Sequence, residues 1–205
     1  LLRKKKILSN YYSIIVQKKI PVFAGLGGGT SNAYSLFRYF NKGKFKKDLN
    51  NMFFKEIGSD FELFKHKQAF LENLNVVNNF KKQFKLNFLL VYPYIKCSTK
   101  MIYSKVDKYS LKSKLNSKNL KNKKKFIKFL SLNRNDLQQI VEKKAPIVKE
   151  LTSELAQKEG CYFSRLTGSG SVCYGLFSSK RSARAALYEM KLKYPKFWFI
   201  VTKTI

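Results

Sequence analysis

A glycine-rich stretch, Gly25-Leu26-Gly27-Gly28-Gly29, is the part of the sequence best suited to bind an anion. Glycine leaves backbone N–H groups unshielded and permits positive φ, so successive amides can converge on one ligand. Thr30 and Ser31 follow and are good helix N-caps, which brings the positive end of a helix dipole to the same place. The stretch therefore predicts a phosphate site. It is neither a Walker A loop nor a dinucleotide fingerprint, because the Gly-Lys-Ser/Thr and the third spaced glycine are missing.

Two further segments carry residues that could act on a bound ligand. Asp60 follows Gly58-Ser59, where an aspartate ordinarily forms a turn but where a carboxylate can also accept a proton. Thr167-Gly168-Ser169-Gly170-Ser171 lies between two apolar runs. That segment is suited to a hairpin connection, to a close backbone approach to a ligand, or to both.

The elements that would position these residues follow from apolar spacing and from glycine or proline boundaries. The first part of the chain predicts a strand over 11–20, a helix after Ser31, a second helix ending at Ile57 and an extended segment over 69–74. The second part predicts strands over 86–92, 161–166, 172–177 and 197–202, with helices on both sides of Pro146 and over Ala183–Met190. Its order, β-α-β-β-α-β, is typical of a ferredoxin-like antiparallel sheet.

Composition limits the classes of function that remain. The chain has 205 residues and 42 Lys and Arg against 12 Asp and Glu, a net charge of +30. The basic residues are overwhelmingly Lys, whereas specific nucleic-acid recognition relies on Arg, so compositional drift is favoured over nucleic-acid binding. The polar segment Lys112–Lys125 is expected to be a surface loop. No apolar run reaches 18 residues, so no membrane-spanning helix is predicted.

The cysteines and the single histidine give no metal or disulfide signal. Cys97, Cys161 and Cys173 form no CxxC pair, and His66 has no neighbouring ligand cluster. We expect buried, unreactive thiols, no metal-ligating side chains, and a reducing cytoplasm as the location of the protein.

Four segments together resemble the GHMP kinase superfamily. Pro21 to Ala33, with Gly-Leu-Gly-Gly-Gly-Thr-Ser-Asn-Ala, is similar to its second conserved motif, and Arg165 to Ser171 is similar to its third. Ile57-Gly58-Ser59-Asp60 and the Leu89–Thr99 stretch agree in order and spacing. Within the superfamily the glycine motif is most similar to the enzymes that phosphorylate 4-diphosphocytidyl-2-C-methyl-D-erythritol in non-mevalonate isoprenoid biosynthesis.

The resemblance implies a role for each matched residue. Asp60 would be the catalytic carboxylate that accepts the proton of the substrate's 2-hydroxyl, and Mg²⁺ would accompany the nucleotide. The residues Gly168, Ser169 and Gly170 would line the cleft for substrate and phosphate. ATP would be bound by the loop amides and hydroxyls of Pro21, Val22, Phe23, Ala24, Gly25, Leu26, Gly27, Gly28, Gly29, Thr30 and Ser31.

The family's first motif, Pro-Ala-Lys-Ile/Leu-Asn, has no counterpart in this sequence. Its lysine stabilises the developing alkoxide and the transferred phosphoryl group. We therefore expect a segment before Leu1 to complete the first lobe, and very weak turnover or poor folding of these 205 residues alone.

The implied fold is α+β with two lobes. Residues 1–84 would be the remainder of an ATP-binding lobe of the ribosomal-protein-S5-domain-2-like type, and residues 85–205 a ferredoxin-like lobe. Three alternatives stay open: another GHMP kinase of the homoserine, mevalonate or galactose type, a basic RNA-binding protein that uses Lys112–Lys125, and an inactive remnant. Against the RNA-binding alternative, no RNP1-like run occurs.

Overall fold

The computed structural model describes residues 2, 3, 6, 8–42, 47–73, 76–80, 82–110 and 122–204. The chain divides into two compact units, 1–20 with 27–80 and 21–26 with 81–205. Residues 21–26 thus belong to the second unit, although they precede most of the first in sequence. Among the described helices, none combines the length and the apolar character that crossing a membrane requires.

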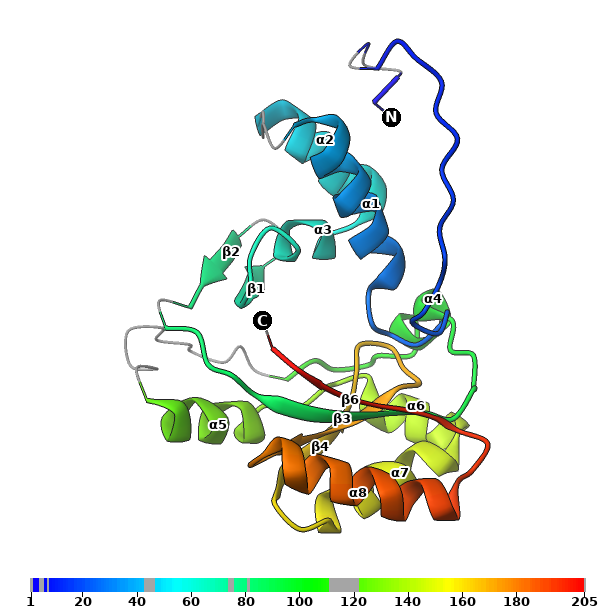
Figure 1. Ribbon diagram of the computed structural model, residues 1–205, viewed down its shortest axis with the longest axis vertical. Helices are drawn as coiled ribbons and strands as arrows, with labels where there is room; N and C mark the ends of the chain where they lie inside the picture. Colours follow the sequence, from blue (N-terminus) through cyan, green and yellow to red (C-terminus); the bar gives the residue numbers. More distant parts are fainter. Residues whose placement is uncertain are drawn as a thin grey trace. The chain divides into compact units, whose positions relative to one another are not determined.

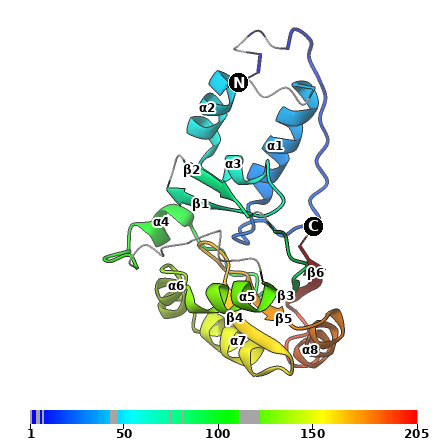
Figure 2. The same ribbon diagram turned by 90° about the vertical axis from the view of Figure 1, so that its left-hand side faces the viewer.

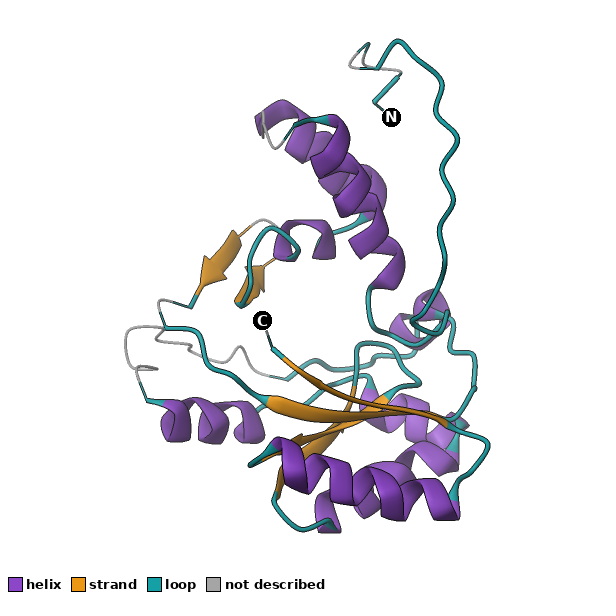
Figure 3. Ribbon diagram, in the orientation of Figure 1, coloured by secondary structure: helices purple, strands orange, loops and turns teal. Residues whose placement is uncertain are grey.

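The described residues of the first unit form three helices and a two-stranded antiparallel sheet, and Figure 3 draws these helices in purple and the strands in orange. Phe37, Phe53 and Phe61, one from each helix, are buried against one another with ring centroids 4.5–5.4 Å apart. Aromatic pairs at such distances add to the free energy gained by burying apolar surface. The elements are α1 (Gly28–Phe40), α2 (Lys47–Ile57), α3 (Asp60–Leu63), β1 (Ala69–Asn73) and β2 (Val76–Asn79).

Residues 11–20 do not form the strand that their β-branched and aromatic residues predict. The segment is extended but has no ladder partner among the described residues, and its side chains are exposed, Ile15 at 94%. A strand is stable only when a neighbouring strand pairs with its backbone groups. The prediction of a strand over 11–20, made from residue pattern alone, is therefore wrong.

The second unit contains a four-stranded antiparallel sheet in the order β4-β5-β3-β6. Counting only these strands along the chain, the order is 2-3-1-4, which is the ferredoxin-like arrangement that the sequence predicts. The elements are β3 (Asn87–Tyr92), α4 (Thr99–Tyr103), α5 (Lys123–Leu132), α6 (Gln138–Lys144), α7 (Pro146–Gln157), β4 (Cys161–Leu166), β5 (Cys173–Phe177), α8 (Lys180–Lys193) and β6 (Trp198–Lys203).

Helices α7 and α8 cover one face of this sheet (Figures 1 and 2). Alternation along β3 separates the two faces, because successive side chains of a strand point to opposite sides. Leu89 and Val91 are fully buried in the core shared with the helices. Leu90 and Tyr92 lie on the opposite face, where they pack with Ala24 of the 21–26 segment.

Most of the predicted Lys112–Lys125 loop lies outside the described residues, which stop at 110 and resume at 122. Its last three lysines are not loop: Lys123, Lys124 and Lys125 form the first turn of α5. The Asn122 side chain caps this helix by accepting a hydrogen bond from the Lys124 N–H at 2.8 Å. Burial of Phe126 and Ile127 against the second unit outweighs the polar composition of the segment.

Candidate functional site

The glycine stretch leads directly into α1. Gly27 is the N-cap in a left-handed conformation (φ 64°), and Ser31 is the residue whose N–H bonds back to the Gly27 carbonyl at 2.9 Å. Thr30 and Ser31 therefore lie within the first turn of the helix. The prediction that they cap it is wrong. Glycine takes the cap because a Cβ at position 27 would face both positive φ and the Phe64 ring at 3.2 Å.

Space is open beside the first residues of α1. A Cβ added at Gly28 or Gly29 meets nothing within 4 Å. The N–H groups at the start of an α-helix have no partner inside the helix, and the first turn of α1 contains no acidic residue. The amides of Gly28, Gly29 and Thr30 and the helix dipole together suit a bound phosphate.

The first half of the glycine stretch is instead in close contact with the loop 167–171. A Cβ at Gly25 (φ 69°) would lie 2.6 Å from the Thr167 carbonyl oxygen and 2.9 Å from that of Gly170. The Ala24 carbonyl accepts hydrogen bonds from the Thr167 hydroxyl at 3.2 Å and from the Val172 N–H at 3.3 Å. Residues 21–26 are thus held against the predicted third motif by the Thr167 hydroxyl, by the close backbone approach at Gly25 and by the N–H of Val172, which follows the motif.

Val22 and Phe23 are exposed at 57% and 59%, so their side chains do not fill the core. The Tyr92 hydroxyl donates to the Val22 carbonyl at 3.1 Å, which attaches this turn to the end of β3. Burial raises the pKa of Tyr92, so its hydroxyl stays protonated and remains a donor at neutral pH. Tyr92 was not among the residues singled out from the sequence.

The loop 167–171 presents backbone on one side and buried hydroxyls on the other. Gly168 is exposed, whereas Ser169 and Ser171 are buried. Ser169 and Thr99 share a hydrogen bond of 2.9 Å, and the Ser171 hydroxyl donates to the Ile95 carbonyl. Of the predicted cleft residues, Gly168 can touch a ligand directly, while Ser169 mainly fixes the loop.

Asp60 begins α3 and is exposed. The next residue, Phe61, is fully buried in the aromatic cluster of the first unit, which fixes the backbone at Asp60. No hydrogen bond or ion pair of the Asp60 carboxylate occurs within the described residues. Glu62 differs, because Lys65 binds both of its oxygens at 2.6 Å. Asp60 is therefore the carboxylate of this short helix that is free to act on a ligand.

The cysteines and His66 add no candidate chemistry. Cys97 and Cys173 are buried, Cys161 is partly buried, and all three are free thiols. Burial raises the pKa of each, that of Cys161 to about 11, so the unreactive thiol predominates at neutral pH. Searching the described part of the chain finds no group of three or more His, Cys, Asp and Glu residues that could hold a metal ion.

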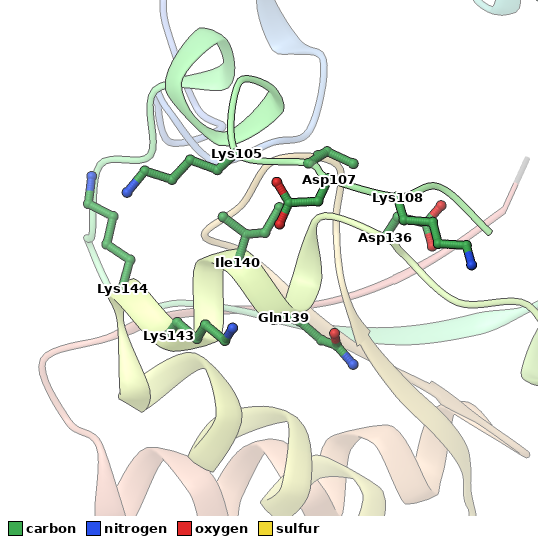
Figure 4. Close-up of a pocket in the computed structure, with 9 residues that line it drawn as sticks. Lys105, Asp107, Lys108, Asp136, Gln139, Ile140, Lys143 and Lys144 are labelled. Atoms are coloured by element: carbon green, nitrogen blue, oxygen red, sulfur yellow. The ribbon is translucent and has the colours of Figure 1, made fainter.

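A separate hollow lies between the segment after α4 and the helix α6 (Figure 4). All four of its lysines are exposed, on a chain whose net charge is +30, so the hollow is part of a generally basic surface. It contains none of the site residues predicted from the sequence. Its lining is Lys105, Val106, Asp107, Lys108, Asp136, Gln139, Ile140, Lys143 and Lys144.

Comparison with known proteins defines the class first. A family model described as "GHMP kinases C terminal" matches residues 111–196. A crystal structure of 4-(cytidine 5'-diphospho)-2C-methyl-D-erythritol kinase superposes with a TM-score of 0.69 at 20% identity, covering 90% of this chain and 68% of that one. Homoserine kinase from Cytophaga hutchinsonii superposes with a TM-score of 0.66 at 13% identity, covering 92% and 68%. The predicted α+β fold of a GHMP kinase is confirmed.

Sequence relatives define the family within that class. The 4-diphosphocytidyl-2-C-methyl-D-erythritol kinase of Pelagibacter ubique (strain HTCC1062) is 38% identical over 210 residues, covering all of this chain and 74% of its own length. The enzyme of the same name from Wolbachia pipientis wMel is 33% identical, covering 94% of this chain and 68% of its own length. The chain belongs to the family of 4-diphosphocytidyl-2-C-methyl-D-erythritol kinases.

Proposed function

We propose that this chain catalyses ATP-dependent phosphorylation of the 2-hydroxyl of 4-diphosphocytidyl-2-C-methyl-D-erythritol, a step of non-mevalonate isoprenoid biosynthesis. The observation that carries the proposal is the open, triple-glycine start of α1 in a member of this kinase family. The substrate and pathway come from the relatives that carry that name. We also propose that the reaction takes place in the cytoplasm, where ATP is available and where reducing conditions keep cysteines such as these as free thiols.

The nucleotide phosphates are bound by backbone amides in this proposal. Gly28, Gly29 and Thr30 supply N–H groups at the positive end of α1, and no atom lies within 4 Å of where a Cβ would be at Gly28 or Gly29. The Thr30 and Ser31 hydroxyls are further donors. Residues 21–26, which complete the segment that resembles the family's second motif, are proposed to contribute backbone groups as well. Positioning and charge neutralisation are the main requirements of phosphoryl transfer, so such a site needs few reactive groups.

Asp60 is the proposed general base. Its carboxylate accepts the proton of the 2-hydroxyl while the hydroxyl oxygen forms a bond to the γ-phosphorus of ATP, and the bond from that phosphorus to the bridging oxygen breaks to release ADP. The free carboxylate and the backbone fixed by buried Phe61 support the role. Removal of one base typically lowers rate by about 10²–10⁴-fold.

Mg²⁺ belongs to the nucleotide in this proposal. Mg²⁺ is usually bound through one or two carboxylates together with substrate phosphates, rather than by a protein cage. In this proposal the nucleotide phosphates and water would be its main ligands, since Glu62 is occupied by Lys65 and Asp60 is assigned the role of base. When bound, the ion neutralises charge on the transferred phosphoryl group.

The family's Pro-Ala-Lys motif is not found in this sequence, so these 205 residues lack its alkoxide-stabilising lysine. We expect turnover by the 205-residue chain to be far below that of a chain extended with a motif-bearing segment from a matched relative. Comparable rates for the two would show that the lysine is dispensable here.

The proposed function is tested by phosphoryl transfer with three acceptors and two variants. We expect ADP release, with a new phosphate ester seen by ³¹P NMR, from 4-diphosphocytidyl-2-C-methyl-D-erythritol and not from homoserine or mevalonate. Asp60→Asn should lower the rate of transfer by about 10²–10⁴-fold while ATP affinity stays within about twofold, because the base acts on the acceptor. Glu62→Gln is the matched control and should leave transfer intact. Transfer to homoserine, or an Asp60→Asn enzyme with the wild-type rate, would contradict the proposal.

A further inference from the structure

The last residue of β4, Leu166, requires partners from outside the sheet. β4 is an edge strand, and Leu166 pairs with Cys173 of β5 on one side only. Backbone groups on the open side of an edge strand must be satisfied by other donors and acceptors when they are buried, and Leu166 is 1% exposed.

Two side chains at the start of α6 provide those partners. The Gln138 side-chain oxygen accepts a hydrogen bond from the Leu166 N–H at 3.0 Å. The Asn135 amide nitrogen donates to the Leu166 carbonyl at 3.1 Å and to the Gly168 carbonyl at 2.7 Å. The Asn135 oxygen accepts from the Leu137 N–H at 3.0 Å, which fixes which end of the amide faces the loop. Asn135 therefore joins the end of β4 to the turn of the loop 167–171.

The loop held in this way supports the first half of the glycine stretch. Thr167 and Val172 bind the Ala24 carbonyl, and the Thr167 and Gly170 carbonyls lie where any side chain at position 25 would go. The Gly170 N–H in turn donates to the Thr167 carbonyl at 2.8 Å. A shift of the loop would therefore displace residues 21–26.

We propose that Asn135 is a positioning residue: its amide, together with Gln138, fixes the loop 167–171 and through it residues 21–26 in the arrangement that binds ATP phosphates. This proposal rests on the proposed function only for the identity of the ligand, ATP. The hydrogen bonds that hold the loop are observed independently of that function. Asn135 acts through the loop backbone.

The test is Asn135→Asp in the full 205-residue chain. The substitution keeps the shape and the oxygen that accepts from Leu137, but it replaces two donated hydrogen bonds by a carboxylate facing two carbonyl oxygens. We expect the Kd for ATP, measured by calorimetry, to rise about tenfold. The free energy lost with a hydrogen bond of this kind typically corresponds to about that factor in an equilibrium constant. We also expect faster amide exchange at Gly170 and Val172.

Asn133→Asp is the matched control. The Asn133 amide also donates to one backbone carbonyl, that of Phe129 at 2.6 Å, but it lies at the end of α5, and within the described part of the chain no hydrogen bond joins it to the loop. Both variants lose an amide donor, so a general loss of stability should affect both. Unfolded chains bind no ATP, so such a loss lowers the measured binding stoichiometry and leaves the Kd of the folded chains unchanged. The control should keep the wild-type Kd and the wild-type exchange at Gly170 and Val172.

The outcomes separate this inference from the proposed function. A raised Kd confined to Asn135→Asp supports the positioning role. Equal Kd values for the two variants overturn it and leave the proposed function intact. A wild-type chain that binds no ATP contradicts the proposed function and overturns this inference with it.

Discussion

The start of α1 and the loop 167–171 are both rich in glycine, but their surroundings are opposite. At Gly28 and Gly29 an added Cβ meets nothing within 4 Å. In the loop, Ser169 and Ser171 are buried, and side chains of Thr99, Asn135 and other segments bind it. One region is open to a ligand and the other is fixed by its neighbours.

The difference shows that glycine serves two purposes in this chain. At Gly28 and Gly29 the space that a side chain would fill is open, and the proposed benefit of glycine there lies in binding. At Gly25 the missing side chain lets two backbone segments approach, so its benefit lies in structure. Sequence alone presents all of these as one glycine-rich stretch.

Substitution of these glycines by alanine should separate the two purposes. Gly25→Ala places a methyl group 2.6 Å from the Thr167 carbonyl oxygen in a backbone with φ 69°. We expect the free energy of unfolding to fall by about 3 kcal/mol, because positive φ and backbone overlap act together. Urea denaturation monitored by circular dichroism measures this change.

Gly29→Ala is the paired variant, and its stability should be unchanged or raised by up to about 1 kcal/mol, since alanine favours the helix more than glycine does. Its ATP affinity should fall, because the methyl group enters the space assigned to a phosphate. Equal losses of stability in both variants would show that Gly25 and Gly29 both serve the structure, and would contradict the distinction between them.

A smaller effect is expected at Asp136, which anchors the segment after α4 to the start of α6. Burial raises the pKa of this carboxyl, but hydrogen bonds from the Ser110 side chain and backbone and the nearby Arg134 outweigh burial, so its pKa is lowered on folding. A carboxyl whose pKa is lower in the folded state stabilises the protein above its unfolded pKa of about 4, and this stabilisation is lost as pH falls further.

Asp136→Asn should therefore flatten the decline in stability between neutral pH and about pH 3, at a cost near neutrality on the order of 1 kcal/mol. Unfolding curves over that pH range provide the measurement. Asp107→Asn serves as the control, since this exposed carboxylate lines the same hollow without the Ser110 contacts. If both variants show the wild-type pH dependence, Asp136 is not the group responsible.

The sequence predicted the second unit well because its strands are apolar enough to be recognised singly. The 86–92 and 172–177 runs have few polar residues, and Pro146 marks the start of α7 as expected. The segment 11–20 has the same β-forming composition but is no strand, because pairing depends on a partner that local pattern does not reveal. Strand β2, with only four residues, gave too weak a pattern to be identified.

The candidate site was predictable only where chemistry and local sequence coincide. Three consecutive glycines before an apolar helix pattern identify the start of α1, although the cap is Gly27 rather than Thr30 or Ser31. Asn135 was not predicted as part of the site, because its partner Gly168 is 33 residues away and the bond is to backbone. Side-chain to backbone hydrogen bonds at that separation leave no trace in residue spacing.

The most direct test of the account is an ATP titration of the ¹⁵N-labelled chain, followed through the backbone amides. If the open end of α1 binds the phosphates, the N–H signals of Gly28, Gly29 and Thr30 should move downfield and saturate together with a single Kd. ADP should cause smaller shifts, and adenosine should leave these signals in place. Saturable ATP binding that moves other amides while these three stay unchanged would contradict the central claim.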